Sequence, residues 1–319
     1  MGGPLPFRFG VIGEAIASRE GLLGEARRAE DLGYATLLLR DHFVPEPFGD
    51  QLAPMVALTA AAGVTRTLRV GSLVLDNDYR HPVMLAKEAA TLDLLSEGRF
   101  ELGIGAGWAR EEYRRAGLPF DEPAVRVGRL QEALQVLKGL LAGHPLTFEG
   151  EHYSVHGVAG FPAPVQRPHP PILVGAGSRR MLGIAGREAD VVGILPRALP
   201  EGTISAALSE RAPEAVARKV AWVREAAAGR PRPVELSLVL ATALDRDHRK
   251  AAERFAVERG WGAAAAELVL EMPSVAAGPA ERVVEELQAR RERYGFSYLV
   301  VSDGDMEAFA PVVERLAGC

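Results

Sequence analysis

The stretch YATLLLRDH, at residues 34–42, joins an uninterrupted apolar run to a polar end. A run without polar alternation is typical of a strand in a parallel sheet, because side chains cover both faces of such a sheet. Amphipathic helical patterns flank the stretch at Arg19–Leu32 and Ala53–Val64. This alternation, with polar residues where the strand ends, predicts a parallel α/β fold.

The same unit repeats eight times along the 319 residues, which predicts a (β/α)8 TIM barrel. Gly33, Gly98 and Gly295 each separate a helical pattern from an apolar strand, as a helix-ending glycine does. The strands are expected at Phe7–Ile12, Tyr34–Arg40, Leu68–Leu75, Arg99–Gly105, Ile172–Val174, Asp190–Leu195, Val234–Ala241 and Phe296–Val301.

Two stretches interrupt this rhythm, after the fourth and the seventh unit. The first insertion, about 142–171, combines a hairpin pattern at Leu146–Val155 with the proline-dense segment Phe161–Pro171, which we expect to form a lid or wall. The second, about 261–279, is weakly patterned. Residues 1–319 are therefore expected to form one domain with two insertions.

Composition points to a small-molecule partner. The net charge of −5 provides no broad basic face for a nucleic acid. The single cysteine, Cys319, excludes a disulfide within this sequence and fits a reducing cytoplasm. Met1–Pro6 lacks the pattern of a secretion signal, and no apolar stretch is long enough to span a bilayer. We expect a cytoplasmic protein without a membrane partner.

Asp41 and His42 are the sharpest candidates for chemistry, because barrel active sites lie at the carboxyl ends of the strands. A histidine exchanges protons near neutral pH, and an adjacent carboxylate can set its tautomer or hold a ligand hydroxyl. The alternative is a histidine that packs under a loop.

The third strand also ends in polar residues. Small residues at Gly71 and Ser72 would let a flat ring approach the backbone, whereas Asp76 and Asn77 fit equally well as turn formers. Taken alone, the residues favour turn formation. The same reading applies to Arg80 and His81.

Gly103–Trp108 follows the fourth strand but lacks the spacing of a dinucleotide fingerprint. Its glycines make a floor without side chains, and Trp108 either lines a pocket or packs beneath the next helix. Glu111 and Glu112 are expected on a solvated helix face.

Gly175–Arg180 lies between the fifth strand and a helix start. Free N–H groups, the positive helix end, Ser178 and two arginines there favour a phosphate site. The alternative is a tight glycine turn with solvated arginines. No lysine at a strand end, no paired metal-binding histidines and no GxSxG motif occur, so Schiff-base chemistry, a histidine-rich metal centre and a serine nucleophile are not expected.

Several motifs in order extend over most of the chain. They are Leu32-Gly33-Tyr34, Arg40-Asp41-His42-Phe43, Val70–Leu75, His81-Pro82, Ser96–Arg99, Gly103–Trp108 and Pro164–Pro168. Together they resemble the bacterial luciferase-like monooxygenase superfamily. The resemblance is closest to its subgroup of coenzyme F420-dependent oxidoreductases.

The resemblance implies a barrel that holds the deazaflavin coenzyme F420, or alternatively FMN, at the strand ends. It implies a non-proline cis peptide at Leu73–Val74 beneath the ring, with Asp41 and His42 as the acid and histidine near the reactive edge. The candidate catalytic residues are thus His42 and Asp41. The candidate coenzyme-binding residues are Asp41, Leu73, Val74, Asp76, Asn77, Ala106, Gly107, Trp108, Gly175, Ala176, Gly177, Ser178 and Arg179.

The chain also departs from related deazaflavin-dependent sugar-phosphate dehydrogenases. Those proteins have an acid after the fourth-strand glycines and a tryptophan after the histidine, whereas this chain has Trp108 and Glu46. A water or Glu46 is therefore expected as the second proton-transfer group, and the substrate stays open.

The resemblance implies hydride transfer between the reduced deazaflavin and an organic substrate, with His42 handling the proton. The alternatives are an FMN-dependent monooxygenase and a non-catalytic flavin-binding protein on the same scaffold. A homodimer is expected because the second and third helices have apolar residues on more than one face, at Met55, Leu58, Val83, Leu85 and Leu92.

Overall fold

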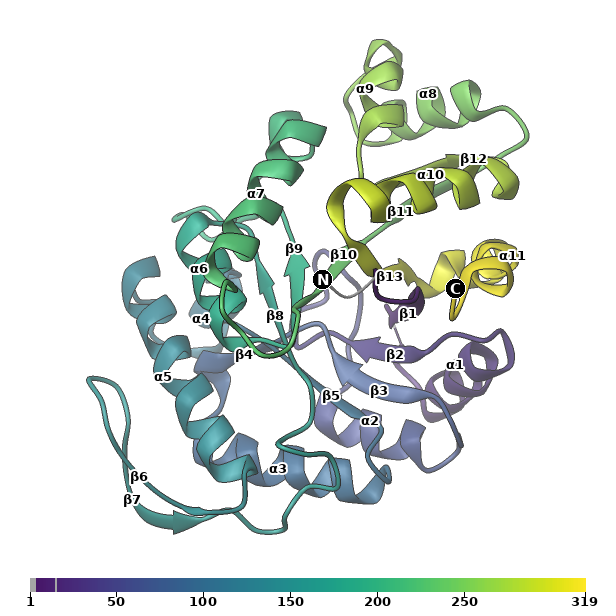
Figure 1. Ribbon diagram of the computed structural model, residues 1–319. Helices are drawn as coiled ribbons and strands as arrows, with labels where there is room; N and C mark the ends of the chain where they lie inside the picture. Colours follow the sequence, from purple (N-terminus) through teal and green to yellow (C-terminus); the bar gives the residue numbers. More distant parts are fainter. Residues whose placement is uncertain (1–3, 15) are drawn as a thin grey trace.

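The computed structural model describes residues 4–14 and 16–319, so Met1–Gly3 of the N-terminal stretch lie outside the described residues. Its centre is a closed barrel of eight parallel strands, which confirms the predicted TIM barrel (Figure 1). Around the barrel the strands are β1 (Arg8–Gly13), β2 (Thr36–Leu39), β3 (Arg69–Ser72), β5 (Phe100–Gly105), β8 (Ile172–Ala176), β9 (Val191–Ile194), β10 (Glu235–Val239) and β13 (Phe296–Ser302). Strand β13 pairs with β1, and β3 pairs with β5.

Helices cover the outside of the barrel. They are α1 (Arg19–Asp31), α2 (Pro54–Ala62), α3 (Pro82–Leu95), α5 (Pro123–Leu141), α6 (Arg179–Glu188), α7 (Pro213–Ala226), α10 (Ala280–Tyr294) and α11 (Met306–Leu316), with a short α4 (Arg110–Ala116) after β5. Helix α1 shows why these segments are helical: Leu22, Ala26 and Ala29 recur at helical spacing and are buried, while Ser18 accepts a hydrogen bond from the Gly21 amide. Gly33, with φ +80°, turns the chain from α1 into β2.

The third predicted strand is divided. A cis peptide joins Leu73 to Val74, which confirms the predicted geometry, and β4 (Leu75–Asp76) continues the strand beyond it. Strand β4 pairs with the end of β5, so this stretch stays part of the barrel wall.

Both insertions have structure of their own. The first contains the antiparallel hairpin β6 (Pro145–Glu149) and β7 (Ser154–Ala159). The second begins at Ala241, about twenty residues before the expected 261. It consists of β11 (Ala241–Leu244), α8 (His248–Glu258), α9 (Ala266–Glu271) and β12 (Val275–Gly278), the upper lobe in Figure 1. Strands β11 and β12 pair in parallel, and this part has a separate hydrophobic cluster.

The sequence predicted a lid or wall at Phe161–Pro171, but this proline-rich segment lies at the amino-terminal rim of the barrel, away from the carboxyl ends of the strands. The Asp93 carboxylate accepts hydrogen bonds from the Val165 and Gln166 amides at 2.7 and 3.0 Å. The Gln166 side chain in turn accepts one from Arg69, the first residue of β3, at 2.9 Å. These contacts hold the segment against the amino-terminal rim of the barrel.

The apolar residues that suggested a dimer lie mostly in the core. Leu58, Leu85 and Leu92 are buried against the barrel. The outer faces of α2 and α3 nevertheless expose Val56 and Leu95. Within residues 4–14 and 16–319, none of the helices combines the length and the apolar character needed to cross a bilayer.

Candidate active site

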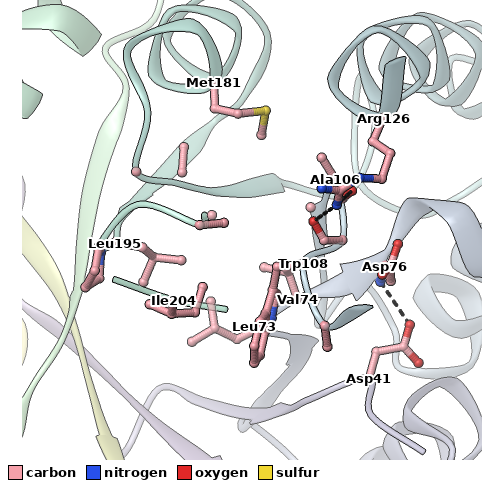
Figure 2. A pocket seen from close by; sticks show the side chains of 18 of the residues that line it. Asp41, Leu73, Val74, Asp76, Ala106, Trp108, Arg126, Met181, Leu195 and Ile204 are labelled. Carbon is pink, nitrogen blue, oxygen red and sulfur yellow. Dashed lines mark hydrogen bonds between the residues drawn. The ribbon is translucent and has the colours of Figure 1, made fainter. Parts of the chain in front are cut away.

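A cavity of about 280 Å³ opens at the carboxyl ends of the barrel strands. Its size is near that of small-ligand sites. In Figure 2, Asp41 and Asp76 lie on one side of the cavity, and Leu195 and Ile204 lie on the other. The sequence-predicted residues that line it are Asp41, His42, Leu73, Val74, Asp76, Ala106, Gly107, Trp108, Gly175, Ala176, Gly177 and Ser178. Their role in coenzyme binding stays a prediction.

His42 is held by Glu112, an acid that we predicted from the sequence to lie on a solvated helix face. Its Nδ1 lies 2.8 Å from a carboxylate oxygen of Glu112, and the other oxygen of that carboxylate accepts a hydrogen bond from the Phe43 amide. Glu112 is 1% exposed, so the prediction of a solvated role is wrong. Ala109, Glu112 and Tyr113 are spaced as one helical face, which was the available signal that Glu112 points inward.

This contact fixes the chemistry of the imidazole. Burial alone would raise the pKa of Glu112, but the hydrogen bond and charge of His42, with the backbone amides, outweigh burial and lower it. An ionised Glu112 accepts a hydrogen bond from the N–H group at Nδ1, and Nε2 then has no protein partner among the described residues. Trp108 packs edge-on against the ring, with centroids 5.8 Å apart. Nε2 is therefore the atom available to a ligand.

Asp41 does not orient His42, contrary to one reading of the sequence. Both of its carboxylate oxygens bind the Arg80 guanidinium, one of them at 2.9 Å, and it also accepts a hydrogen bond from the Asp76 amide at 3.0 Å. Arg80, read from the sequence as a loop residue, is thus the counter-ion of a buried carboxylate. Asp41 fixes the position of the chain after β4.

Asp76 serves both roles that the sequence left open. It accepts a hydrogen bond from the Asp78 amide at 2.9 Å and so caps the turn, and its side chain lines the cavity. The Tyr113 hydroxyl donates to it at 2.7 Å. Burial raises the pKa of Asp76 to about 7. Asn77, by contrast, is buried outside the cavity lining and donates to the Tyr153 hydroxyl at 3.2 Å.

The floor of the cavity is backbone. Gly105, Ala106 and Gly107 present no large side chain, and Gly107 has φ +73°. A β-carbon at Gly107 would collide with the Tyr113 hydroxyl and the Asp76 carboxylate, so glycine is required there. Trp108 lines the cavity, which resolves its two readings in favour of a pocket wall.

The helix start after β8 differs from the expected phosphate cradle. Gly177 and Ser178 line the cavity, and the Ser178 hydroxyl accepts a hydrogen bond from the Met181 amide at 3.4 Å. The Arg179 side chain is exposed and lies over the Trp222 ring, 5.8 Å from its centroid, rather than in the cavity. Arg179 does not line the cavity, and its part in a phosphate site stays a prediction.

Sequence reasoning missed two parts of the site. The connection between β9 and α7 supplies an apolar wall through Pro196, Leu199 and Ile204, although no periodic pattern marks it. Its unusual length was the available signal, since long connections in compact domains are often functional. Arg126, near the start of α5, also lines the cavity.

Glu46, expected from the sequence as one choice for the second proton-transfer group, lies outside the cavity. Its side chain is 70% exposed, pairs with Arg115 at 3.6 Å and does not line the cavity. Glu112 occupies the place beside His42 instead. Among the residues that the structure describes, no group of three or more histidine, cysteine, aspartate or glutamate side chains is arranged to hold a metal ion.

The observed surfaces fit an elongated coenzyme with a flat ring and an anionic tail. Leu73, Val74 and the glycine floor form an apolar bed. Gly177 and Ser178 lie at the amino end of α6, where backbone N–H groups favour an anion. A ring on the bed would lie beside His42, and its tail would extend toward α6.

Comparisons with known proteins identify similar sequences and similar folds. The chain is 35% identical to an F420-dependent glucose-6-phosphate dehydrogenase of Kineococcus radiotolerans over 58% of its own length, and this match spans 55% of that relative. A protein of the same name from Amycolatopsis mediterranei is 28% identical, with 91% of this chain and 83% of the relative covered.

Among solved structures, the coenzyme F420-dependent tetrahydromethanopterin reductase of Methanopyrus kandleri has the same fold, with a TM-score of 0.75. Its sequence is 20% identical, and 98% of each chain is covered. The sequence model of the family described as luciferase-like monooxygenase matches residues 1–312. Because that match spans nearly the whole chain, the chain belongs to the luciferase-like monooxygenase family.

Proposed function

We propose that this protein is an oxidoreductase that uses coenzyme F420 to transfer hydride to or from a small organic substrate. The observation that carries the proposal is the His42–Glu112 pair at 2.8 Å, which lines the same cavity as the apolar bed of Leu73, Val74 and glycine backbone. The relatives named as F420-dependent dehydrogenases support the choice of coenzyme.

The coenzyme and the residues of the site have separate roles. A bound deazaflavin supplies or accepts hydride at its C5 position. Glu112 keeps the proton of neutral His42 on Nδ1, so Nε2 accepts the substrate proton when the substrate is oxidised. In the reverse direction an imidazolium donates that proton from Nε2. Pro196, Leu199 and Ile204 form the apolar wall that limits the access of water.

Titration of the purified protein with coenzyme F420 and with FMN, followed by fluorescence, tests this proposal. We expect saturable binding of the deazaflavin in the micromolar range or below. Failure of both coenzymes to bind below the millimolar range would eliminate the proposal. Reduction of bound coenzyme by candidate alcohols, or its oxidation by carbonyl acceptors, then identifies the substrate.

A second candidate is an FMN-dependent monooxygenase, which the description of the matched family favours. Such an enzyme consumes oxygen with reduced FMN, whereas a deazaflavin lacks the ring nitrogen N5 and reacts poorly with oxygen. Oxygen uptake coupled to hydroxylation with reduced FMN, and no turnover with coenzyme F420, would replace the first candidate with this one.

We further propose a homodimer in the cytoplasm. Val56, Met84 and Leu95 are 74%, 56% and 59% exposed on α2 and α3, an apolar surface that a second copy would cover. The single cysteine fits a reducing compartment. Light scattering of the wild-type protein should give twice the chain mass. The Val56→Glu variant should give a lower mass, because the glutamate would weaken the dimer. A monomer at micromolar concentration contradicts the dimer.

A further inference from the structure

We propose that Arg126, together with the amino end of α6, binds the phosphate group of the coenzyme. This inference rests on the proposed coenzyme-dependent function and assigns its anion site to a residue on α5. Phosphate is the group that flavin and deazaflavin coenzymes both carry on the ribityl chain, so one site would serve either.

The first observation is that Arg126 has donor capacity to spare. Its Nε donates to the Asp121 carbonyl at 3.0 Å, and its Nη1 donates to the Ala106 carbonyl at 3.2 Å and to the Gly107 carbonyl. Its Nη2 has no acceptor among the described residues. Because Arg126 lines the cavity, that group is available to a ligand.

The second observation is that this buried charge has no carboxylate partner. Within residues 4–14 and 16–319, Arg126 and Lys219 are the cationic residues of lowest exposure, 3% and 4%. Lys219 pairs with Glu210 at 2.7 Å, whereas none of the ion pairs among the described residues includes Arg126. The guanidinium carbon lies 4.1 Å from the centroid of the Phe120 ring, which stabilises the cation but does not neutralise it. An anion in the cavity would supply the missing counter-charge.

The third observation is that Arg126 lies near the start of α6. Arg180, the second residue of α6, donates to the Ala124 carbonyl in the first turn of α5 at 3.2 Å, so the amino ends of the two helices are joined. Arg126 and Ser178 line the same cavity. The backbone amides of Arg179 and Arg180 have no acceptor among the described residues.

These groups match phosphate better than a neutral ligand. A guanidinium and the free N–H groups of a helix start provide charge and several donors for the oxygens of one phosphate. The carbonyl contacts of Arg126 also place it next to the glycine floor, on the path of a tail that leaves the ring. The absence of a carboxylate partner for Arg126 and the free backbone amides of Arg179 and Arg180 thus both indicate a phosphate group.

The test uses two probes that differ only in this group: the 8-hydroxy-5-deazariboflavin core and its 5′-phosphate. We expect the wild-type protein to bind the phosphorylated probe at least about tenfold more tightly, as for a charge-assisted hydrogen bond. In Arg126→Gln that preference should fall below about threefold, while affinity for the phosphate-free core changes little. The readout is equilibrium binding by fluorescence.

Each alternative gives a different result. The inference is overturned if Arg126→Gln weakens the binding of both probes equally, or if the preference for the phosphorylated probe is unchanged. Arg126 would then only support the glycine floor. Arg179→Gln is the matched control, and loss of the preference there instead would also overturn it. Arg126→Lys, which keeps the charge, should retain part of the preference and serves if Arg126→Gln does not fold.

Wild-type binding separates the two proposals. Binding of the core without any preference for its phosphate rejects the inference and leaves the proposed function standing. Binding of neither probe rejects both.

Discussion

The two ends of the barrel differ in how their buried charged side chains are paired. At the amino-terminal rim, Glu101 lies between Arg8 and Arg69, each 2.5 Å from one of its oxygens, and Arg8 also pairs with Glu235 at 2.7 Å. At the carboxyl-terminal mouth, Arg126 has no carboxylate partner among the described residues. The rim neutralises its charges within the protein, whereas the mouth keeps a charge for which a ligand can compensate.

The electrostatics of the two ends follow from these contacts. At the rim, burial would raise the pKa of Glu101, but the charges of Arg8 and Arg69 outweigh burial and lower it. At the mouth, burial raises the pKa of Asp76 to about 7 because its partners, Tyr113 and the Asp78 amide, are uncharged. We interpret the rim as a stability device and the mouth as a ligand site.

His42→Ala should have the largest effect on activity. It tests whether the carboxyl-terminal mouth is the catalytic end of the barrel. Loss of the proton-transfer group is expected to lower kcat by about 10² to 10⁴ with little change in coenzyme affinity. Steady-state turnover and a coenzyme titration measure the two quantities. His156→Ala, whose ring is exposed, is the control. Unchanged turnover with every tested acceptor would reject the catalytic role of His42.

Glu101→Gln should have the largest effect on folding. Removal of the carboxylate leaves Arg8 and Arg69 facing each other, so we expect a loss of about 3 kcal/mol in the free energy of unfolding. Chemical denaturation gives the value. Glu111→Gln, which removes exposed pairs on α4, should change the free energy of unfolding much less. Equal losses in the two variants would remove the distinction between the rim and the surface.

Asp76→Asn tests the effect of the buried carboxyl at the mouth on the pH dependence of stability. The folded-state pKa of Asp76 is raised to about 7 from the usual 3.8, so its contribution to stability is complete below about pH 4 and is lost as pH rises to 7. An asparagine does not ionise and still accepts from the Asp78 amide. At pH 8 the variant should be more stable than the wild type, on the order of 2 kcal/mol.

Thermal midpoints of both proteins between pH 4 and pH 8 test this prediction. The two curves should converge at the acidic end and diverge at the basic end. Parallel curves over the whole range would show that Asp76 ionises without penalty in the folded protein.

Glu112→Gln should have the smallest of these effects. A glutamine amide is able to donate to Nδ1 as well as accept from it, so the preferred tautomer of His42 is lost, and we expect kcat to fall about tenfold. KM and coenzyme affinity should stay within about twofold. Glu111→Gln, the exposed neighbour, is the control. A change confined to KM would place Glu112 in substrate binding instead of in the positioning of His42.

Regular patterns in the sequence predicted the barrel well. Apolar runs such as Leu37–Leu39 and helical spacing such as Leu22, Ala26 and Ala29 report burial directly, so they located the strands and helices. The position of Asp41 and His42 at a strand end was also sufficient to place them at the mouth. The cis peptide at Leu73–Val74 came from the resemblance and not from any local pattern.

The partners of these residues were not predictable from local patterns. Glu112 and Arg126 reach the cavity from helices, and their inward direction depends on how α4 and α5 pack on the barrel. The place of the proline-rich segment at the amino-terminal rim was not predictable either, because its anchoring contacts with Asp93 and Arg69 are distant in sequence. Propensity reports local structure, whereas these contacts are tertiary.

A crystal structure of the protein with coenzyme F420 tests the central claim most directly. We predict the deazaflavin ring on the bed at Leu73 and Val74, with its reactive edge facing His42 Nε2 and its phosphate within hydrogen-bond reach of Arg126. Coenzyme bound elsewhere on the protein, with this cavity left to solvent, would contradict the account.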